Sequence, residues 1–145
     1  MNAIDFLVKE HHRVRKTLTE INNESHREDT RKKMFDALCQ DLLLHEEMEH
    51  KKWYPHFRDD KRLNQTVKHL LTEEKGAEKA IHQFDNVKSY EEWEQKFLKF
   101  KRDVEHHAYE EEHDLFPEVR KLFSEEDLEK IGQELYEFKQ EHRAH

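Results

Sequence analysis

The sequence predicts an all-α fold: an up-down-up-down four-helix bundle followed by a short additional C-terminal helix. Charged residues make up 41% of the 145 residues, whereas glycine and proline occur only twice each. Few turn-forming residues, together with many Glu, Lys, Leu and Phe, are typical of long helices. The 9 Phe, 4 Tyr and 2 Trp supply apolar volume for one core. We therefore expect one domain over residues 1–145, with the bundle at about 3–122 and the accessory helix at about 125–142.

The first two helices are predicted from apolar residues that recur three or four positions apart. The first helix covers about 4–22, and its apolar stripe skips one position, which is occupied by His11. The second helix begins at about residue 30 and reaches the high fifties, where Pro55 ends or kinks it. Its apolar stripe ends in two polar residues, His45 and Glu49.

The third and fourth helices carry the same kind of interruption. The third helix covers about 64–86, and the gap in its stripe falls at Glu74. The fourth opens at a capping box that begins at Ser89, and its stripe leads to His107 and Glu111. A similar cap at Ser124 opens the C-terminal helix, whose apolar residues share one face that we expect to cover the bundle: Leu128, Ile131, Leu135 and Phe138.

The chain contains an internal repeat of one helical hairpin. When the second helix is aligned with the fourth by its apolar stripe, His45 and Glu49 coincide with His107 and Glu111. When the first helix is aligned with the third in the same way, His11 meets the third-helix gap. Inward positions at one level of a four-helix bundle converge on a shared axis. We therefore expect six polar side chains to meet inside: His11, His45, Glu49, Glu74, His107 and Glu111.

These six residue types predict a metal centre. Burying three carboxylates together costs on the order of several kcal/mol each unless something compensates their charge. Imidazole and carboxylate ligands suit iron or manganese, whereas the single cysteine, Cys39, excludes a thiolate-rich zinc site. Two glutamates on opposing helices can bridge two metal ions, with the three histidines as terminal ligands. The alternative is an all-α interaction protein whose buried polar groups pair with one another.

Three segments of the sequence resemble the bacterial hemerythrin-like, or HHE cation-binding, family over about residues 3–120. They are LVKEHHRVRKTL, HEEMEHKKWYP and HHAYEEEHDLFP. The last two contain the family's H-x-x-x-E pattern followed by an aromatic residue and a proline. The resemblance implies a four-helix bundle that holds a non-haem di-iron centre, oxo- or hydroxo-bridged, with these ligands: His11, His45, Glu49, His107 and Glu111. The third helix departs from the family, because Glu74 stands where a histidine is usual.

The departure at Glu74 shapes the expected function. Three carboxylates stabilise ferric over ferrous iron, which works against reversible oxygen transport. We therefore expect the protein to act on peroxide or O2, by catalase- or peroxidase-like detoxification or in iron handling. The alternative is a module that senses O2, NO or iron, or binds O2, without turnover. H2O2, O2 or NO would be the small-molecule partner, and manganese would suit the same ligands.

Composition limits the other partners. The net charge of −8 argues against a nucleic-acid partner. We see no signal peptide and no apolar run of about 20 residues, so we expect a cytoplasmic protein that makes no use of a membrane. Several residues near the stripes are not counted among the ligands. Registry with the apolar stripe excludes Lys75, and Glu78 is a possible extra ligand for which a surface position is favoured. The others are expected beside the ligands or at the surface (His12 and His106), at the surface (His56, His69 and His82) or in packing (Tyr54 and Tyr109).

Overall fold

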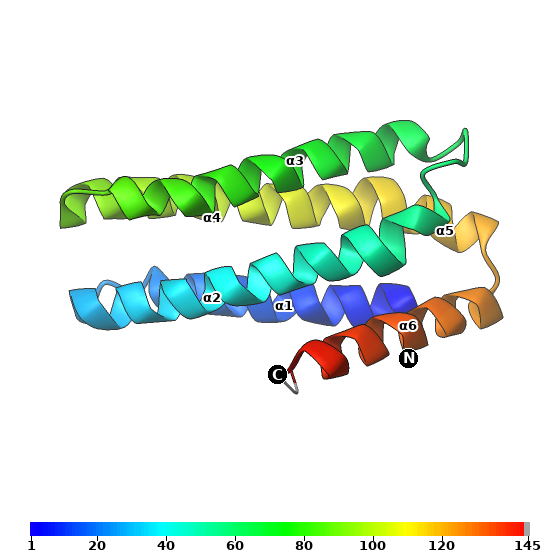
Figure 1. Ribbon diagram of the computed structural model, residues 1–145, viewed down its shortest axis with the longest axis horizontal. Coiled ribbons are helices and arrows are strands. Elements are labelled where there is room, and N and C mark those ends of the chain that lie inside the picture. Colours follow the sequence, from blue (N-terminus) through cyan, green and yellow to red (C-terminus); the bar gives the residue numbers. More distant parts are fainter. Residues whose placement is uncertain (144–145) are drawn as a thin grey trace.

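Four long helices lie side by side in the computed structural model, which describes residues 1–143 (Figure 1). Successive helices run in opposite directions, in agreement with the predicted up-down-up-down order (Figure 1). No strand occurs within the described residues, so the all-α prediction is confirmed. The helices are α1 (Ala3–Ile21), α2 (Glu28–Met48), α3 (Asn64–Gln83) and α4 (Tyr90–Glu110).

Two of these helices widen at their C-terminal ends into π-helical turns. α2 continues into η1 (Glu49–Trp53), and α4 continues into η4 (Glu111–Leu115). The π-helix bonds each residue to the fifth along the chain, and such turns are frequent at functional sites. A proline follows each turn, and its missing N–H prevents a regular α-helical bond there. The remaining short elements are η2 (Tyr54–His56), η3 (Phe84–Asn86) and α5 (Phe116–Leu122).

The apolar core is divided into two clusters. The first, which we call the Phe35 cluster, consists of Leu18, Ile21, Phe35, Leu38, Cys39, Leu42, Trp93, Phe97 and Phe100. The second, which we call the α6 cluster, gathers residues such as Ile4, Leu7, Met48, Trp53, Leu70, Leu115 and Leu135. The positions between the two clusters along the helices are those of the predicted polar residues. The fold thus places a polar layer between two apolar blocks.

A buried arginine ties α2 to two other elements beside the Phe35 cluster. Arg31 is 1% exposed, and its Nε donates a 2.8 Å hydrogen bond to the carbonyl oxygen of Ile21. Its Nη1 lies 2.7 Å from the carboxylate of Glu94 on α4. The Arg31 guanidinium therefore joins the end of α1 to the first turns of α4.

The C-terminal helix α6 (Glu125–Arg143) lies along α1 (Figure 1). Its cap is formed as expected, since the Oγ of Ser124 accepts a 3.1 Å hydrogen bond from the amide of Asp127. The four apolar residues of its predicted face are all buried, which confirms that this face covers the bundle. Lys139 of α6 also pairs with Glu10 of α1. None of the helices within residues 1–143 is long and apolar enough to cross a membrane.

Candidate metal centre

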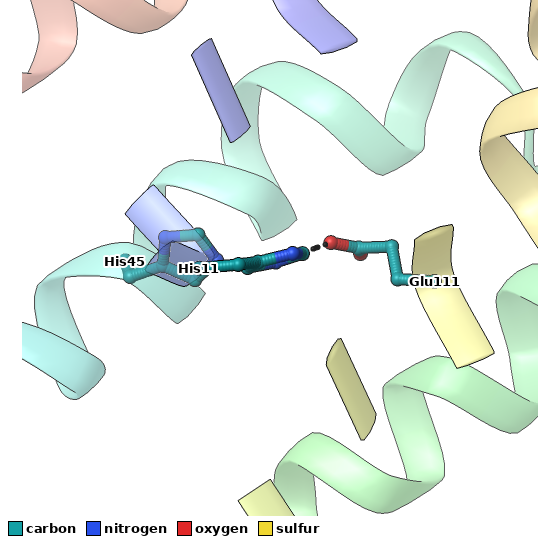
Figure 2. Close-up of side chains that lie close together, drawn as sticks. All are labelled: His11, His45 and Glu111. Atoms are coloured by element: carbon teal, nitrogen blue, oxygen red, sulfur yellow. Dashed lines mark ion pairs between the residues drawn. The ribbon is translucent and has the colours of Figure 1, made fainter. Parts of the chain in front are cut away.

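All six residues of the predicted centre lie in the polar layer. They form two groups that share Glu111: His11, His45 and Glu111 in the first, and Glu49, Glu74, His107 and Glu111 in the second. Within each group, one ligand atom from every residue lies within 4.8 Å of the others. Figure 2 shows the first group, in which the Nε2 atom of His11 points at the carboxylate of Glu111 from a distance of 3.1 Å. The fold thus brings ligand types from four helices into contact.

The carboxylates of this centre are fully buried and incompletely bonded. Glu49 and Glu111 are 0% exposed, and Glu74 is 1% exposed. Within residues 1–143, neither oxygen of Glu49 has a hydrogen-bond partner, nor has Oε1 of Glu111. Buried carboxylate oxygens are seldom left in this way, because the lost solvation is costly. Cations bound by the two groups would restore the missing interactions, so the residues present fit metal ions.

Each of the three histidines turns its Nε2 atom toward the buried carboxylates. The distances are 3.1 Å from His11 to Glu111, 2.9 Å from His45 to Glu49, and 2.9 Å from His107 to Glu74. The Glu49 oxygen nearest to His45 has no hydrogen-bond partner despite this short distance. Such an arrangement, in which two ligand atoms lie close together without a hydrogen bond between them, is expected where both point at a shared metal ion.

The opposite ring nitrogen of each histidine faces an outer carboxylate. The Nδ1 distances are 2.7 Å from His11 to Glu112, 3.3 Å from His45 to Glu10, and 2.9 Å from His107 to Glu73. A carboxylate that receives Nδ1–H fixes the tautomer and leaves Nε2 free to bind metal. Sequence reasoning missed these three glutamates, because outer carboxylates have no fixed spacing from the histidines that they hold.

Tyr54 takes part in the site, although the sequence favoured a packing role. Its hydroxyl donates to Oε2 of Glu74 at 3.1 Å and also contacts Oε2 of Glu111. The side chain is 2% exposed, and burial, followed by the nearby carboxylates, raises its pKa well above the usual value. Tyr54 therefore keeps its proton beside two candidate ligands. Tyr109, by contrast, is 55% exposed and stacks on His113.

His50 is a further contact that the sequence analysis missed. Its Nε2 lies 2.7 Å from Oε1 of Glu74. On a regular α-helix His50 would point about 100° away from Glu49, but it lies within the π-helical turn η1. The repeat carries a hint of this role, since the position equivalent to His50 in the second hairpin is Glu112, the outer carboxylate of His11.

The electrostatics of the metal-free site show the charge that cations would balance. Burial, and then the charges of Glu111 and Glu74, raise the pKa of Glu49 well above its usual value. Burial also acts to raise the pKa of Glu74, but hydrogen bonds from His107 and His50 outweigh it and hold the pKa at about 2. In the same way the pKa of His107 rises to about 10, because Glu73 and Glu74 overcome the effect of burial. The raised pKa values of Glu49 and His107 both favour bound protons, which offset part of the carboxylate charge when no metal is bound.

The other polar residues near the stripes lie where they were expected. Exposed residues include His12, His56, His69, Lys75, His82 and His106. Glu78 is half-buried and belongs to neither ligand group of the centre; it lies beside Glu46, a buried residue of α2. Burial, and then the nearby carboxylates of Glu74 and Glu78, raise the pKa of Glu46 to about 9.

A cavity of about 480 Å³ lies beside the candidate centre. Four of the six candidate ligands line it: His11, His45, Glu74 and His107. Much of the rest of its wall is apolar, with Val14, Leu18, Leu42, Ala77, Phe100 and Val104. A small molecule in this cavity would therefore meet the candidate centre on one side and hydrocarbon on the other.

Comparisons with known proteins identify the family. Neither the search of curated proteins nor that of solved structures returned a match. The family model described as the hemerythrin HHE cation-binding domain matches residues 2–119, which include all six candidate ligands and both π-helical turns. The chain therefore belongs to the hemerythrin HHE cation-binding domain family, whose domains bind metal ions, typically iron.

Proposed function

We propose that the protein is a non-haem di-iron protein whose carboxylate-rich site acts on peroxide or O2. The observation that carries this proposal is the pair of ligand groups that meet at Glu111, with buried carboxylate oxygens that have no other partner within the described residues. His11 and His45 would hold one cation, and His107 and Glu74 would hold the other. Glu111 belongs to both groups, and Glu49 lies 2.9 Å from His45 of the first group.

Charge balance supports two cations rather than one. The layer contains three carboxylates that are 0–1% exposed, and with the histidines bound to metal as neutral imidazoles a single divalent ion would leave one negative charge uncompensated. Two divalent ions and one hydroxide neutralise the three carboxylates. This pattern of ligands from facing helices is the one by which bundles hold two metal ions.

The choice of peroxide or O2 rests on the ligand set and the cavity. When bound, iron supplies the redox chemistry, and three carboxylates favour its ferric state. The cavity beside the centre admits a molecule of the size of H2O2 or O2, and its apolar wall limits the water that reaches the buried ligands. Tyr54 holds a proton at its hydroxyl, directly beside Glu74 and Glu111. This hydroxyl orients the two carboxylates and is a proton donor within the site.

Elemental analysis combined with an optical spectrum tests the proposal. We expect about two irons per chain in the protein expressed with ample iron, and loss of both the iron and its absorption in Glu49→Ala/Glu111→Ala. The matched control is Glu47→Ala/Glu118→Ala, which removes two carboxylates that lie near Glu49 and Glu111 in sequence but are 44% and 51% exposed. Equal iron content in the two double variants would contradict the assignment of the centre.

Oxygen evolution from H2O2 then tests turnover. Sustained evolution that depends on the bound iron is expected, and it should vanish in Glu49→Ala/Glu111→Ala. A single slow round of peroxide consumption would contradict the catalytic role and favour a sensor or an O2-binding module.

A further inference from the structure

A second cluster of histidines and glutamates lies at the surface, outside the centre described above. α3 contributes His69 and Glu73, and α4 contributes His106 and Glu110, each pair being four residues apart on one helical face. The Nε2 atom of His69 lies 2.7 Å from Glu110 and 3.4 Å from Glu73. The Nε2 atom of His106 contacts Glu110 and lies 3.9 Å from Glu73. Two helices thus present two nitrogen and two carboxylate donors to one another.

The arrangement of these donors is that of a ligand set. His69, Glu73 and Glu110 each offer one atom within 4.8 Å of the others. The Oε2 atom of Glu110 is buried and has no hydrogen-bond partner within residues 1–143, although Nε2 of His69 is only 2.7 Å away. In the buried centre, likewise, His45 Nε2 lies 2.9 Å from a Glu49 oxygen that has no hydrogen-bond partner. Imidazole and carboxylate donors suit a divalent first-row cation such as Fe²⁺, Mn²⁺ or Zn²⁺.

Glu73 connects this surface cluster with the buried centre. Its Oε2 atom faces His69 and His106, while its Oε1 atom lies 2.9 Å from Nδ1 of His107. The cavity beside the centre is also lined by residues of both sets, with Glu73 and His106 from the cluster and Glu74 and His107 from the centre. A cation held by the cluster therefore lies on the wall of the cavity that reaches the buried ligands.

We propose that His69, Glu73, His106 and Glu110 form an entry site for a divalent first-row cation, from which the ion passes along the cavity to the buried centre. Any metal site that is filled after folding needs an entry path, and the six candidate ligands are only 0–18% exposed. The cluster is open to solvent, since His69 is 59% exposed and His106 is 62% exposed. The inference rests on the proposed function in one respect, namely that the buried centre takes up metal ions.

Zinc binding to the iron-loaded protein tests whether the site exists. The protein is dialysed against Zn²⁺, and zinc and iron are counted separately by elemental analysis. We expect about one zinc per chain in the parent, binding at least about tenfold weaker in His69→Ala/His106→Ala, and parental binding in the control His82→Ala, which removes an exposed histidine of α3. Absence of zinc from the parent, or equal binding by the double variant, would overturn the proposal.

The rate of iron uptake tests the entry role. Metal-free protein is mixed with Fe²⁺ without oxygen, and bound iron is counted over time after rapid desalting. His69→Ala/His106→Ala should fill several-fold more slowly than the parent and His82→Ala, yet reach the same final iron content. Uptake at the parental rate would refute the entry role. If the parent never takes up iron, the proposed function fails, and the surface site still stands if zinc binding by the parent exceeds that of His69→Ala/His106→Ala, so the two failures are distinguishable.

Discussion

The two glycines of the chain provide a matched test of how closely α6 packs on the start of α1. A β-carbon added at Gly132 would lie 2.9 Å from the amide nitrogen of Ala3 and from the carbonyl carbon of Asn2, and closer still to the carbonyl oxygen of Met1. A β-carbon at Gly76, on α3, would have nothing within 4 Å. Ordinary van der Waals contacts begin at 3.4 Å, so α6 must move away from these main-chain atoms to admit alanine at Gly132.

The expected change in the free energy of unfolding follows from comparing Gly76→Ala with Gly132→Ala. Glycine to alanine in a helix interior gains about 1 kcal/mol from helix propensity, and this gain is common to both variants. Forcing extra volume against main-chain atoms costs about 1–3 kcal/mol. Gly76→Ala should therefore raise the free energy of unfolding by up to about 1 kcal/mol, and Gly132→Ala should be about 1–3 kcal/mol less stable than Gly76→Ala.

Urea unfolding of the metal-free variants, followed by far-ultraviolet circular dichroism, measures this difference. Metal-free protein is used because Gly76 lies close in sequence to Glu74, and altered metal binding would obscure the comparison. Equal stabilisation by the two alanines would refute the close approach of α6 to residues 1–3.

Three further predictions concern an outer carboxylate, the buried thiol and the buried arginine. Glu112→Gln removes the charge 2.7 Å from Nδ1 of His11 and should weaken iron affinity by about 10- to 100-fold, as measured by competition with a chelator; unchanged affinity would show that this carboxylate does not support the ligand. Burial, and then the charge of Asp36, raises the pKa of Cys39 to about 12, so at pH 8 a thiol reagent should label the native protein far more slowly than the protein in guanidinium. Labelling at equal rates would place this thiol outside the core. Arg31→Met leaves the carbonyl of Ile21 without its 2.8 Å donor and should lower the free energy of unfolding by about 1–3 kcal/mol in the same urea assay, whereas parental stability would show that the bond contributes nothing.

The sequence predicted the helices and the six central residues because both depend on the helical period. The repeat placed His45 and Glu49 in register with His107 and Glu111, and registry with the apolar stripe selected Glu74 rather than Lys75. The structure brings all six together, as the pattern required. Their role as metal ligands stays a prediction that the iron analysis tests.

The residues that the sequence did not reveal lie where the helical period fails. The π-helical turns shift every following residue around the helix axis, which directs His50 toward Glu74 and brings Tyr54 into the layer. A regular α-helical period cannot anticipate these positions, although the prolines that follow the turns mark where the period breaks. Contacts between helices, such as Glu112 with His11, depend on the rotation of each helix and have no local signal.

The polar layer between the Phe35 cluster and the α6 cluster affects which part of the bundle opens first. In most bundles the loops are the first parts to loosen, because the middle of each helix is held by continuous apolar packing. Here charged and polar side chains occupy the layer between the two apolar clusters, and three of its carboxylates are 0–1% exposed. Removing the ions should speed amide hydrogen exchange in the middle of α1 and α3 and at the π-helical turns that follow α2 and α4, rather than at the termini and loops. Bound cations would then cross-link the four helices at the polar layer, and the helical segments of that layer would be the first to open when the cations are lost.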